Sequence, residues 1–506
     1  MHRFIQQLLF SASLITLGTS LSWGASSLKL SLQTGPPTTK TQASGMGFGS
    51  DESIAITFDG KQVAFAQANA QGAFHSAITV PATATPGAHN VKAVGQSSGD
   101  QAQATFTVRT DWPTFHFSPQ RNGVNRFENV LNANNVPRLQ LSWQGLMGDL
   151  VDFSSPAVVN GVVYIGSTDG NLYAFNANGC GSSECNALWS GFTGEAVYSS
   201  PTVANGVVYV GSNSRKLVAF NAAGCGAATC IPVWTGTIGG SILESSPVVA
   251  NGVVYVGSFD NKLYAFAAKG CSKAACDPLW TGATGNHIEA SPAIANGVVY
   301  VGSNDNKLYA FNAAGCGAAE CSPLWTGATN GSIFESSPAV ANGVVYIGSF
   351  DKKLYAFNAA GCGAATCSPL WAGQTGDFVD GSTPAIGMGF VFVGSGDGLL
   401  YVFHANGCGQ SVCQPLWTGG SVGEQAAIES SPVLANGIVY VGKNSGQVLA
   451  YNANGCGQAF CLAIWQGSTI EEQIVTSTPA VVNGVVYIGS GNQLGGQDQG
   501  RLYVFK

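Results

Sequence analysis

The sequence predicts an all-β protein: an eight-bladed β-propeller preceded by a small β-sandwich. A Ser/Thr-Pro step recurs eight times at intervals of 45 to 48 residues, and each step opens four short strand patterns separated by Gly and Asn turns. A period in the forties with four strands per repeat is typical of a propeller blade. The steps lie at Pro156, Pro201, Pro247, Pro292, Pro338, Pro384, Pro432 and Pro479.

The composition argues against two kinds of interaction, which are binding to a nucleic acid and spanning a membrane. The chain has 506 residues, of which only 9% are charged, and a net charge of −7. No basic stripe is present to bind the phosphates of a nucleic acid. Beyond the N-terminus, Gly, Asn and Ser interrupt every apolar run before it reaches the length of a membrane span, so we expect no transmembrane segment in the mature chain. We expect a monomer.

The N-terminus has the pattern of an export signal. Met1–Arg3 is basic, residues 4–23 are mostly apolar, and small residues follow at Gly24, Ala25 and Ser26. This pattern predicts a signal peptide over residues 1–25, with a membrane anchor as the alternative. Export places the protein in the periplasm or outside the cell, where cysteine pairs become disulfides.

Residues 27–109 read as the β-sandwich. The alternating patterns predict strands, and Asp59-Gly60 predicts a hairpin turn between the first two. The strands are expected at residues 53–58, 63–66, 73–80, 89–94 and 102–108. The segments at residues 44–49, 80–82 and 86–89 resemble those of bacterial immunoglobulin-like modules in exported proteins. That resemblance implies a spacer or adhesive unit.

The ends of the repeat predict how the ring closes. A Trp marks each outer strand, but the first precedes the first Ser-Pro step and none follows the last step. We therefore expect Arg138–Trp143 to complete the last blade by pairing with Arg501–Phe505, which removes two open sheet edges. Residues 110–137 are then a lead-in, and residues 138–506 the propeller. The tryptophans are Trp143, Trp189, Trp234, Trp280, Trp325, Trp371, Trp417 and Trp465.

All 14 cysteines fall in the repeats as seven Cys-x4-Cys pairs, one in the loop before each Trp strand that is continuous with its blade. Zinc sites need four ligands, often with His, and an odd number of pairs cannot form four-Cys sites. We therefore predict seven loop-closing disulfides and no metal centre built on them. The pairs are Cys180/Cys185, Cys225/Cys230, Cys271/Cys276, Cys316/Cys321, Cys362/Cys367, Cys408/Cys413 and Cys456/Cys461.

Acidic residues occupy one position that varies while its surroundings barely change. This position lies just before the Ser-Pro step, or one residue earlier still, and it should face the mouth of the central channel. A ring of carboxylates there could hold a cation or a polar ligand; a solvated acidic rim is the alternative. The candidate ligand-binding residues are Asp152, Glu244, Glu289, Glu335, Asp380 and Glu429.

No catalytic set can be assigned. The Asp residues of the Gly-Ser-x-Asp hairpins suit turn geometry and are interpreted as structural. Lys443 and Arg215 break the local repeat and are weak ligand candidates, and His287 is the one His expected near the channel mouth. Residues 419–423 match the Gly-x-Ser-x-Gly pattern of hydrolases but lie between strands with no following helix, so the match is discarded.

The blade sequence resembles the repeat of pyrroloquinoline-quinone (PQQ) propellers. The resemblance is carried by Ser-Ser-Pro, Asn-Gly-Val-Val-Tyr-Val-Gly-Ser, Leu-Tyr-Ala-Phe-Asn-Ala and the closing Trp over about residues 137–506, and by Trp112-Pro113 and Arg121-Asn122-Gly123 in the lead-in. The same repeat serves quinoprotein dehydrogenases and binding scaffolds such as the propeller lipoprotein of the outer-membrane barrel-assembly machinery.

The resemblance implies two alternative functions. Enzymes of the family bind PQQ and Ca²⁺ in the channel, commonly with an Asp base, a basic residue and adjacent disulfide-linked cysteines. This chain has no Cys-Cys dipeptide, and its blades are unusually uniform although a cofactor needs different residues from different blades. We therefore expect a non-enzymatic scaffold that binds a protein or surface ligand on one propeller face. A PQQ- and calcium-dependent alcohol or sugar dehydrogenase is the alternative.

Overall fold

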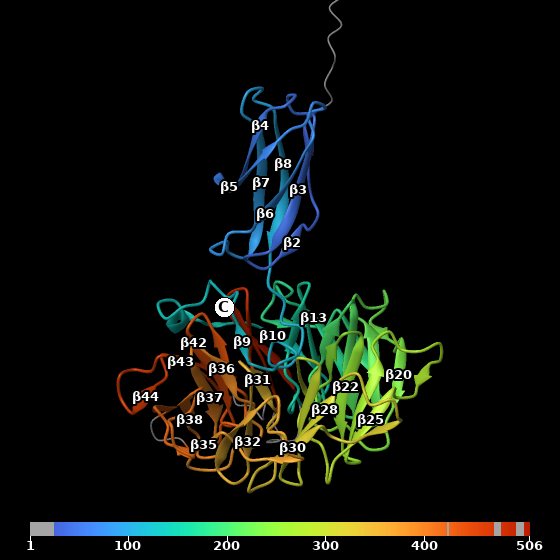
Figure 1. The fold of residues 1–506 in the computed structure, drawn as a ribbon, viewed down its shortest axis with the longest axis vertical. Helices are drawn as coiled ribbons and strands as arrows, with labels where there is room; N and C mark the ends of the chain where they lie inside the picture. The colour runs from blue at the N-terminus through green and yellow to red at the C-terminus, as the bar shows by residue number, and fades with distance from the viewer. Residues whose placement is uncertain (1–24, 422–424, 470–476, 492–499) are drawn as a thin grey trace, which may run out of the picture. The chain divides into compact units, whose positions relative to one another are not determined.

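The chain folds into two compact units, residues Met1–Val108 and Arg109–Lys506, in a computed structural model (Figure 1). The structure describes residues 25–421, 425–469, 477–491 and 500–506. The predicted signal peptide falls outside the described residues, apart from its last residue, Ala25. Within the described ranges, no helix has the length and apolar character needed to cross a membrane.

The first unit consists of two packed sheets, ordered β1-β3-β6 and β2-β8-β7-β4-β5. The five predicted strands are present, and Asp59 and Gly60 both have positive φ, as the two-residue hairpin between β4 and β5 requires. Sequence reasoning missed β1 to β3, which are short or rich in Ser and Gly. The strands are β1 (Ser27–Leu30), β2 (Thr34–Gly35), β3 (Lys40–Met46), β4 (Ser53–Phe58), β5 (Lys61–Gln67), β6 (Phe74–Thr79), β7 (Gly87–Gly95) and β8 (Gln101–Val108).

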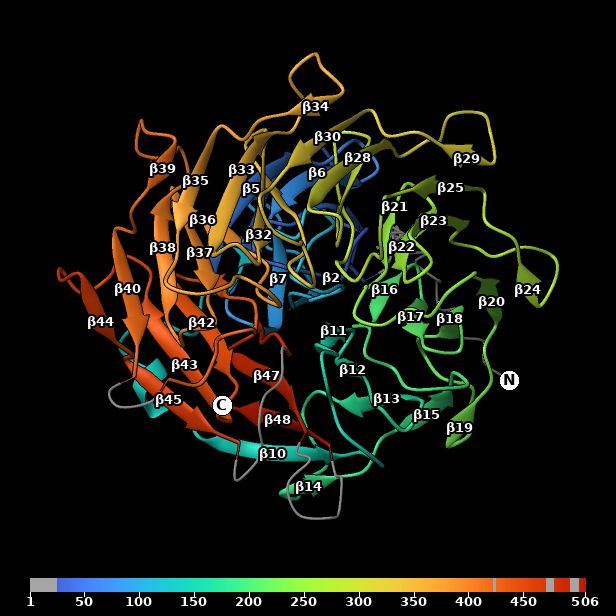
Figure 2. The same cartoon turned by 90° about the horizontal axis from the view of Figure 1, so that it is seen from below.

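The second unit contains eight sheets arranged radially in a ring, which is a β-propeller (Figure 2). Each repeat supplies an inner strand, two middle strands and an outer strand in antiparallel order. The inner strands of blades 1 to 8 are β11 (Ala157–Val159), β16 (Thr202–Ala204), β21 (Val248–Ala250), β26 (Ala293–Ala295), β31 (Ala339–Ala341), β36 (Ala385–Gly387), β41 (Val433–Ala435) and β46 (Ala480–Val482).

The middle strands carry the apolar side chains that pack between neighbouring blades. The first middle strands are β12 (Val162–Gly166), β17 (Val207–Ser212), β22 (Val253–Ser258), β27 (Val298–Ser303), β32 (Val344–Ser349), β37 (Phe390–Gly394), β42 (Ile438–Lys443) and β47 (Val485–Ser490). The second are β13 (Asn171–Asn176), β18 (Lys216–Asn221), β23 (Lys262–Ala267), β28 (Lys307–Asn312), β33 (Lys353–Asn358), β38 (Leu400–His404), β43 (Gln447–Asn452) and β48 (Arg501–Phe505).

The outer strands begin at the repeated Trp in blades 1 to 7. They are β15 (Trp189–Phe192), β20 (Trp234–Thr237), β25 (Trp280–Ala283), β30 (Trp325–Ala328), β35 (Trp371–Gln374), β40 (Trp417–Gly420) and β45 (Trp465–Ser468). Blade 8 takes its outer strand, β10 (Leu141–Leu146), from the N-terminal side of the unit, and β10 pairs with β48 as predicted. The predicted start of this strand was three residues early, because Val136–Arg138 form a 3₁₀ turn (η1) with Pro137 in its first turn.

Each disulfide loop also pairs with the preceding blade. All seven predicted cysteine pairs are disulfide bonds, and the second Cys of each pair lies in a short strand that joins the preceding blade in parallel. We call each such loop a disulfide hook. The hook strands are β14 (Glu184–Cys185), β19 (Thr229–Cys230), β24 (Ala275–Cys276), β29 (Glu320–Cys321), β34 (Thr366–Cys367), β39 (Val412–Cys413) and β44 (Phe460–Leu462).

The position of the second cysteine corrects the sequence prediction, which placed both cysteines of each pair in a loop. Cys461 departs furthest from it: this residue is the middle of β44, is 3% exposed and lies opposite Gly419 of blade 6. The Cys456 N–H also donates to Cys461 Sγ at 2.9 Å. The prediction was wrong on this point because main-chain pairing with a neighbouring blade makes the strand, and spacing within one loop says nothing about that neighbour. The second cysteines are Cys185, Cys230, Cys276, Cys321, Cys367, Cys413 and Cys461.

Each hook therefore links two blades, which the sequence did not predict. In blade 4, Glu320 lies opposite Thr281 of blade 3, and the Thr281 N–H donates to the Ala319 carbonyl at 2.8 Å. In the described residues no hook joins blade 8 to blade 7, because blade 8 has no continuous loop there. The lead-in takes its place: Trp465 Nε1 donates to the Leu139 carbonyl at 3.0 Å.

We predict that the double variant Cys316→Ser/Cys321→Ser loosens one hook without unfolding the propeller. Closing a six-residue loop stabilises it by about 2 kcal/mol in the chain-entropy model. Amide hydrogen exchange at Thr281 should therefore accelerate about 30-fold, while exchange at Thr326, which bonds to the Ala365 carbonyl of the next hook, serves as the internal control. Unchanged exchange at Thr281 would show that the disulfide does not hold the hook in place.

A closed belt of hydrogen bonds explains the Ser-Ser-Pro motif. The N–H of the second Ser or Thr donates to the hydroxyl of the equivalent residue in the next blade, at 2.8 to 3.2 Å, and the last blade returns to the first. Since each buried donor is satisfied by a neighbouring blade, the belt fixes the blades around the channel. Its members are Ser155, Ser200, Ser246, Ser291, Ser337, Thr383, Ser431 and Thr478.

The lead-in lies inside the ring and closes one end of the channel. Its main chain bonds the inner strands of blades 1, 2, 4, 5, 6 and 7 in turn, from the Trp112–Val158 bridge to the pairing of β9 (Val124–Asn125) with β41. Asn125 Nδ2 donates to the Val481 carbonyl of blade 8 at 2.9 Å.

Arg121 provides the lead-in's contacts with blade 3. The fully buried guanidinium donates to the carbonyls of Ser246 and Pro247 at 2.7 and 3.3 Å. The lead-in thus touches every blade.

Candidate functional site

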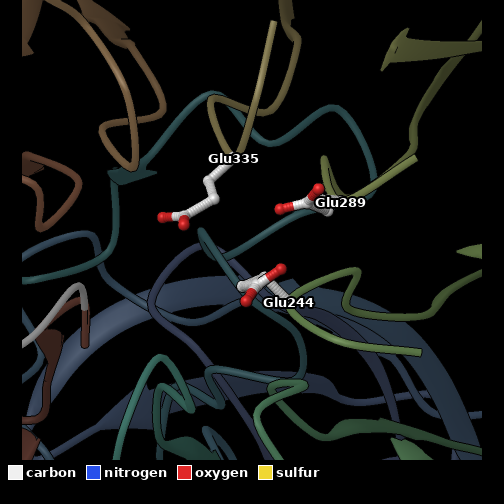
Figure 3. A group of neighbouring side chains, drawn as sticks. All are labelled: Glu244, Glu289 and Glu335. Carbon is white, nitrogen blue, oxygen red and sulfur yellow. The ribbon is translucent and has the colours of Figure 1, made fainter. Parts of the chain in front are cut away.

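The predicted rim acids lie in the loops that enter the inner strands, at the end of the channel opposite the Asn-Gly turns. One carboxylate oxygen from each of Glu244, Glu289 and Glu335 lies within 4.8 Å of the other two, which makes the three a possible cation site. Figure 3 shows these side chains entering a common space from three separate loops. Asp380 joins them, because its Oδ1 accepts the Glu335 N–H at 3.4 Å.

Glu244 and Glu335 also line a small cavity at the bottom of the mouth. Serine hydroxyls of the belt form part of its wall, and Phe115 of the lead-in contributes to the lining. The cavity has a volume of about 30 Å³, which is room for two or three water-sized groups. The lining residues are Phe115, Phe153, Ser200, Glu244, Ser246, Ser291, Glu335, Ser337 and Gly381.

One hairpin position decides which carboxylates are held by the protein. This is the residue between Ser and Asp in the Gly-Ser-x-Asp hairpin, or its equivalent in blade 7. In blades 4 and 7 it is an Asn: Asn304 Nδ2 donates to Glu289 Oε1, and Asn444 Nδ2 to Glu429 Oε2, each at 2.8 Å.

In blades 3 and 5 the same position is Phe259 and Phe350, neither of which can donate a hydrogen bond. Glu244 Oε2 is buried and has no hydrogen-bond partner among the described residues. The two carboxylates next to a Phe are therefore the two that line the cavity, and they lack the amide that holds their neighbours.

Burial and mutual repulsion raise the pKa values of these acids. Burial, followed by repulsion from Glu289, raises the pKa of Glu244 to about 8. Burial and the charge of Asp380 hold the pKa of Glu335 well above its usual range, and burial raises the pKa of Glu289 despite the bond from Asn304.

The pKa values of the two aspartates are raised as well. Burial raises the pKa of Asp380 to about 6 and that of Asp152 to about 7, with the charge of Glu429 adding to both. Five of the six predicted acids thus have raised pKa values, and the charge of Glu429 contributes to three of these increases.

Two groups of aromatic side chains lie on the same loops and hairpins as these acids. Phe350 is half exposed and stacks on Phe378, with ring centroids 5.1 Å apart. Phe259 stacks on His287 at 3.7 Å, and Phe334 lies 6.3 Å from Phe350. We call these five side chains the aromatic collar. His287 therefore lies at the mouth, as expected, but as a stacking partner.

The remaining sequence candidates have structural contacts. In five blades the hairpin Asp accepts a hydrogen bond from a Tyr hydroxyl four residues later, at 2.5 to 2.6 Å. Lys443 is buried, and its Nζ donates to Ser421 Oγ at 2.9 Å. Arg215 stands at a turn position with φ of 61°. Of the discarded hydrolase-like motif, residues 422 and 423 lie outside the described part of the chain.

Sequence reasoning missed the collar and the floor of the cavity. The alternation of Asn and Phe at the hairpin position was visible in the sequence, at Asn213, Phe259, Asn304, Phe350 and Asn444. Its role became clear only in the structure, where the Asn side chains of blades 4 and 7 donate hydrogen bonds to the acids of their own blades. Nothing in the local sequence indicated that Phe115 reaches the cavity.

The cavity does not fit the PQQ cofactor suggested by the family resemblance. PQQ is a planar tricyclic tricarboxylate, whereas sites for small molecules usually measure 300 to 1,000 Å³ and this cavity measures about 30 Å³. The lining contains two carboxylates and no basic side chain, so it would repel the carboxylates of the quinone. No reaction step is therefore assigned to PQQ.

Solved structures share the propeller fold at low sequence identity. BamB from Moraxella catarrhalis is 16% identical, with a TM-score of 0.51, over 72% of this chain and 97% of that chain. The quinohemoprotein alcohol dehydrogenase from Comamonas testosteroni is 15% identical, with a TM-score of 0.59, over 78% of this chain and 80% of that chain. The computationally designed Ika8 protein is 13% identical, with a TM-score of 0.53, over 71% of this chain and 98% of that chain.

Sequence comparison identifies the family. No curated protein matches the chain significantly. The family model described as outer membrane protein assembly factor BamB matches in three overlapping stretches, residues 142–314, 186–359 and 322–501. These stretches cover most of the propeller unit and more than half of the chain. The protein therefore belongs to the BamB family of PQQ-like repeat β-propellers.

Proposed function

We propose that this protein is a non-catalytic binding propeller that holds a positively charged group of its ligand or partner protein at the channel mouth. The seven disulfides indicate an extracytoplasmic protein. The N-terminal pattern supports export through a signal peptide to the periplasm or the cell surface. The first unit then serves as a spacer or adhesive module of the immunoglobulin-like type.

One observation carries the proposal: two carboxylates, Glu244 and Glu335, line the cavity beside a Phe instead of an amide donor. Burial and neighbouring negative charges disfavour the charged form of both carboxylates, which is why their pKa values are raised. A bound cation supplies the missing interaction and restores the charged form. The uniform blades and the small cavity support binding rather than catalysis.

The proposal is tested by thermal unfolding at pH 8 in a panel of chlorides at matched ionic strength: Ca²⁺, Mg²⁺ and n-butylammonium, with sodium butyrate as the anionic control. A cation that binds only the folded state stabilises it by about 1.4 kcal/mol at ten times its Kd. We expect at least one cation to raise the unfolding temperature in a saturable way. If none does so, the proposed function is wrong.

A second experiment tests the dehydrogenase alternative directly. PQQ and Ca²⁺ are added to the purified protein, and quinone absorbance and dye-coupled oxidation of alcohols and sugars are followed. We expect neither stoichiometric binding nor turnover. Stoichiometric PQQ binding together with turnover would contradict a non-catalytic propeller.

A further inference from the structure

The acceptors that line the cavity match the donors of an ammonium group. A primary ammonium has three N–H donors and no acceptor. The cavity is lined by Glu244, Glu335 and four serines of the belt, whose hydroxyl oxygens already accept one belt N–H each and keep a second lone pair. Glu244 Oε2 is buried and unpartnered among the described residues. The volume of about 30 Å³ suits a group of this size.

The rest of the lining favours a cation that carries a hydrocarbon part over a bare metal ion. Ca²⁺ takes six to eight oxygen ligands, but Phe115 and Phe153 present carbon to the cavity. Glu289, the third member of the possible cation site, already accepts a hydrogen bond from Asn304. An ammonium group needs only three acceptors, and the carbon atoms beside it can pack on the rings.

The aromatic collar adds an exposed apolar surface on the same loops and hairpins as the acids. Phe334 and Phe350 are 39% and 50% exposed, although phenylalanine is usually buried. Phe350 belongs to the same hairpin position that leaves Glu335 without an amide donor. Aromatic faces attract cations and also pack against the aliphatic stem that carries them. Acid and ring thus occur together in the same blades.

We propose that the mouth binds a primary ammonium group on an aliphatic stem, with the ammonium between Glu244 and Glu335 and the stem on the aromatic collar. A lysine side chain of a partner protein and a free alkylamine share this chemistry. The inference rests on the proposed function and specifies its ligand.

The test is isothermal titration of the full chain at pH 8. The probes are Nα-acetyl-lysine N-methylamide and n-butylamine, with the Nε-acetylated lysine derivative and CaCl₂ as comparisons. We expect both amines to bind and Nε-acetylation to weaken binding at least 30-fold, because it removes the charge. Tighter binding of the lysine derivative identifies a protein as the source of the amine; tighter binding of n-butylamine identifies a free amine.

Three variants locate the site. Glu244→Gln/Glu335→Gln should weaken amine binding at least tenfold, and Phe350→Ala should weaken it about threefold, as expected for an exposed cation–π contact. Glu320→Gln, on a disulfide hook, is the matched control and should leave the affinity unchanged.

Three results overturn the inference. If Ca²⁺ binds and neither amine does, the proposed function stands and the ammonium inference fails; if no cation binds, both fail. Amine binding that is unchanged in Glu244→Gln/Glu335→Gln places the amine elsewhere and also overturns the inference. A folding defect cannot mimic loss of binding unnoticed, because urea unfolding is measured on the same samples.

Discussion

Replacing Arg121 by Met is expected to destabilise the propeller by about 3–5 kcal/mol, which is a large loss for a single substitution. The guanidinium donates to the main-chain carbonyls of Phe115, Ser246, Pro247 and Pro292 at 2.6 to 3.3 Å. Burying it is costly, and burial lowers its pKa to about 9. Hydrogen bonds from charged donors contribute about 1.5–3 kcal/mol each, so four of them exceed that cost.

The loss is expected because methionine removes the guanidinium donor from four main-chain carbonyls, of which that of Pro247 keeps the Thr202 hydroxyl as a donor at 2.6 Å. The free energy of unfolding from urea titration at pH 7 measures it. Arg121→Lys should lose nearly as much, since one ammonium cannot reproduce the planar fork of the guanidinium. Arg126→Met, an exposed arginine on the same lead-in, is the control and should change stability by less than about 0.5 kcal/mol. A loss below about 1 kcal/mol for Arg121→Met would mean that the lead-in is held by its main-chain bonds alone.

Arg121 also shows which part of the fold was predictable. The blades and the closure of the ring followed from the sequence because the pattern is repeated eight times, and because one Trp precedes the first Ser-Pro step while none follows the last. The bonds of Arg121 join residues up to 171 positions apart and occur once. Neither local periodicity nor strand propensity contains information about such a contact.

The disulfide hooks and the serine belt were only partly predictable from the sequence. Each is repeated, and the cysteine pairing was predicted from spacing alone. What spacing could not provide is the partner: Cys321 closes its own loop but places Glu320 beside Thr281 of the previous blade. Likewise, the N–H of the second Ser of Ser-Ser-Pro donates to a hydroxyl in the next blade. A repeat shows that a position matters but not which neighbour it contacts.

The acidic cluster was found in the sequence because its position varies while everything around it is constant. The sequence left open whether the acids form a solvated rim or a ligand site. The structure adds a difference among the acids: Glu289 and Glu429 each accept a hydrogen bond from an Asn, whereas the equivalent position beside Glu244 and Glu335 is a Phe. That difference depends on a side chain from a neighbouring hairpin, so reading the acids alone could not reveal it.

Removing the charge of the cluster is expected to stabilise the protein when no cation is bound. Burial raises the pKa of Glu244 from 4.5 to about 8, so the folded state binds this proton more tightly than the unfolded state does. The contribution of Glu244 to the free energy of unfolding therefore falls as pH rises from about 4.5 to about 8 and is then constant. Glu244→Gln removes this decrease. We expect the variant to be more stable than the wild type by up to about 5 kcal/mol at pH 8 (about 1.4 kcal/mol for each pH unit between 4.5 and 8) and equal to it below about pH 4.5.

Urea unfolding at pH 4.5, 6.5 and 8 measures this pH dependence. Glu335→Gln should show the same sign, because burial and the charge of Asp380 raise the pKa of Glu335 as well. Glu320→Gln should leave the dependence unchanged, since that carboxylate lies on a hook outside the cluster. If Glu244→Gln is less stable than the wild type at pH 8, and its free energy of unfolding has the same pH dependence, then the folded protein does not disfavour the charged form of Glu244.

The double variant Glu244→Gln/Glu335→Gln also tests whether the acidic cluster binds a cation. A group that reduces the stability of the ligand-free protein is maintained when the ligand compensates for it. At ten times its Kd, a cation adds about 1.4 kcal/mol to the wild type and nothing to Glu244→Gln/Glu335→Gln, so the stability advantage of the variant should shrink as the cation is added. An advantage that stays constant at every cation concentration would mean that no bound cation depends on these two carboxylates.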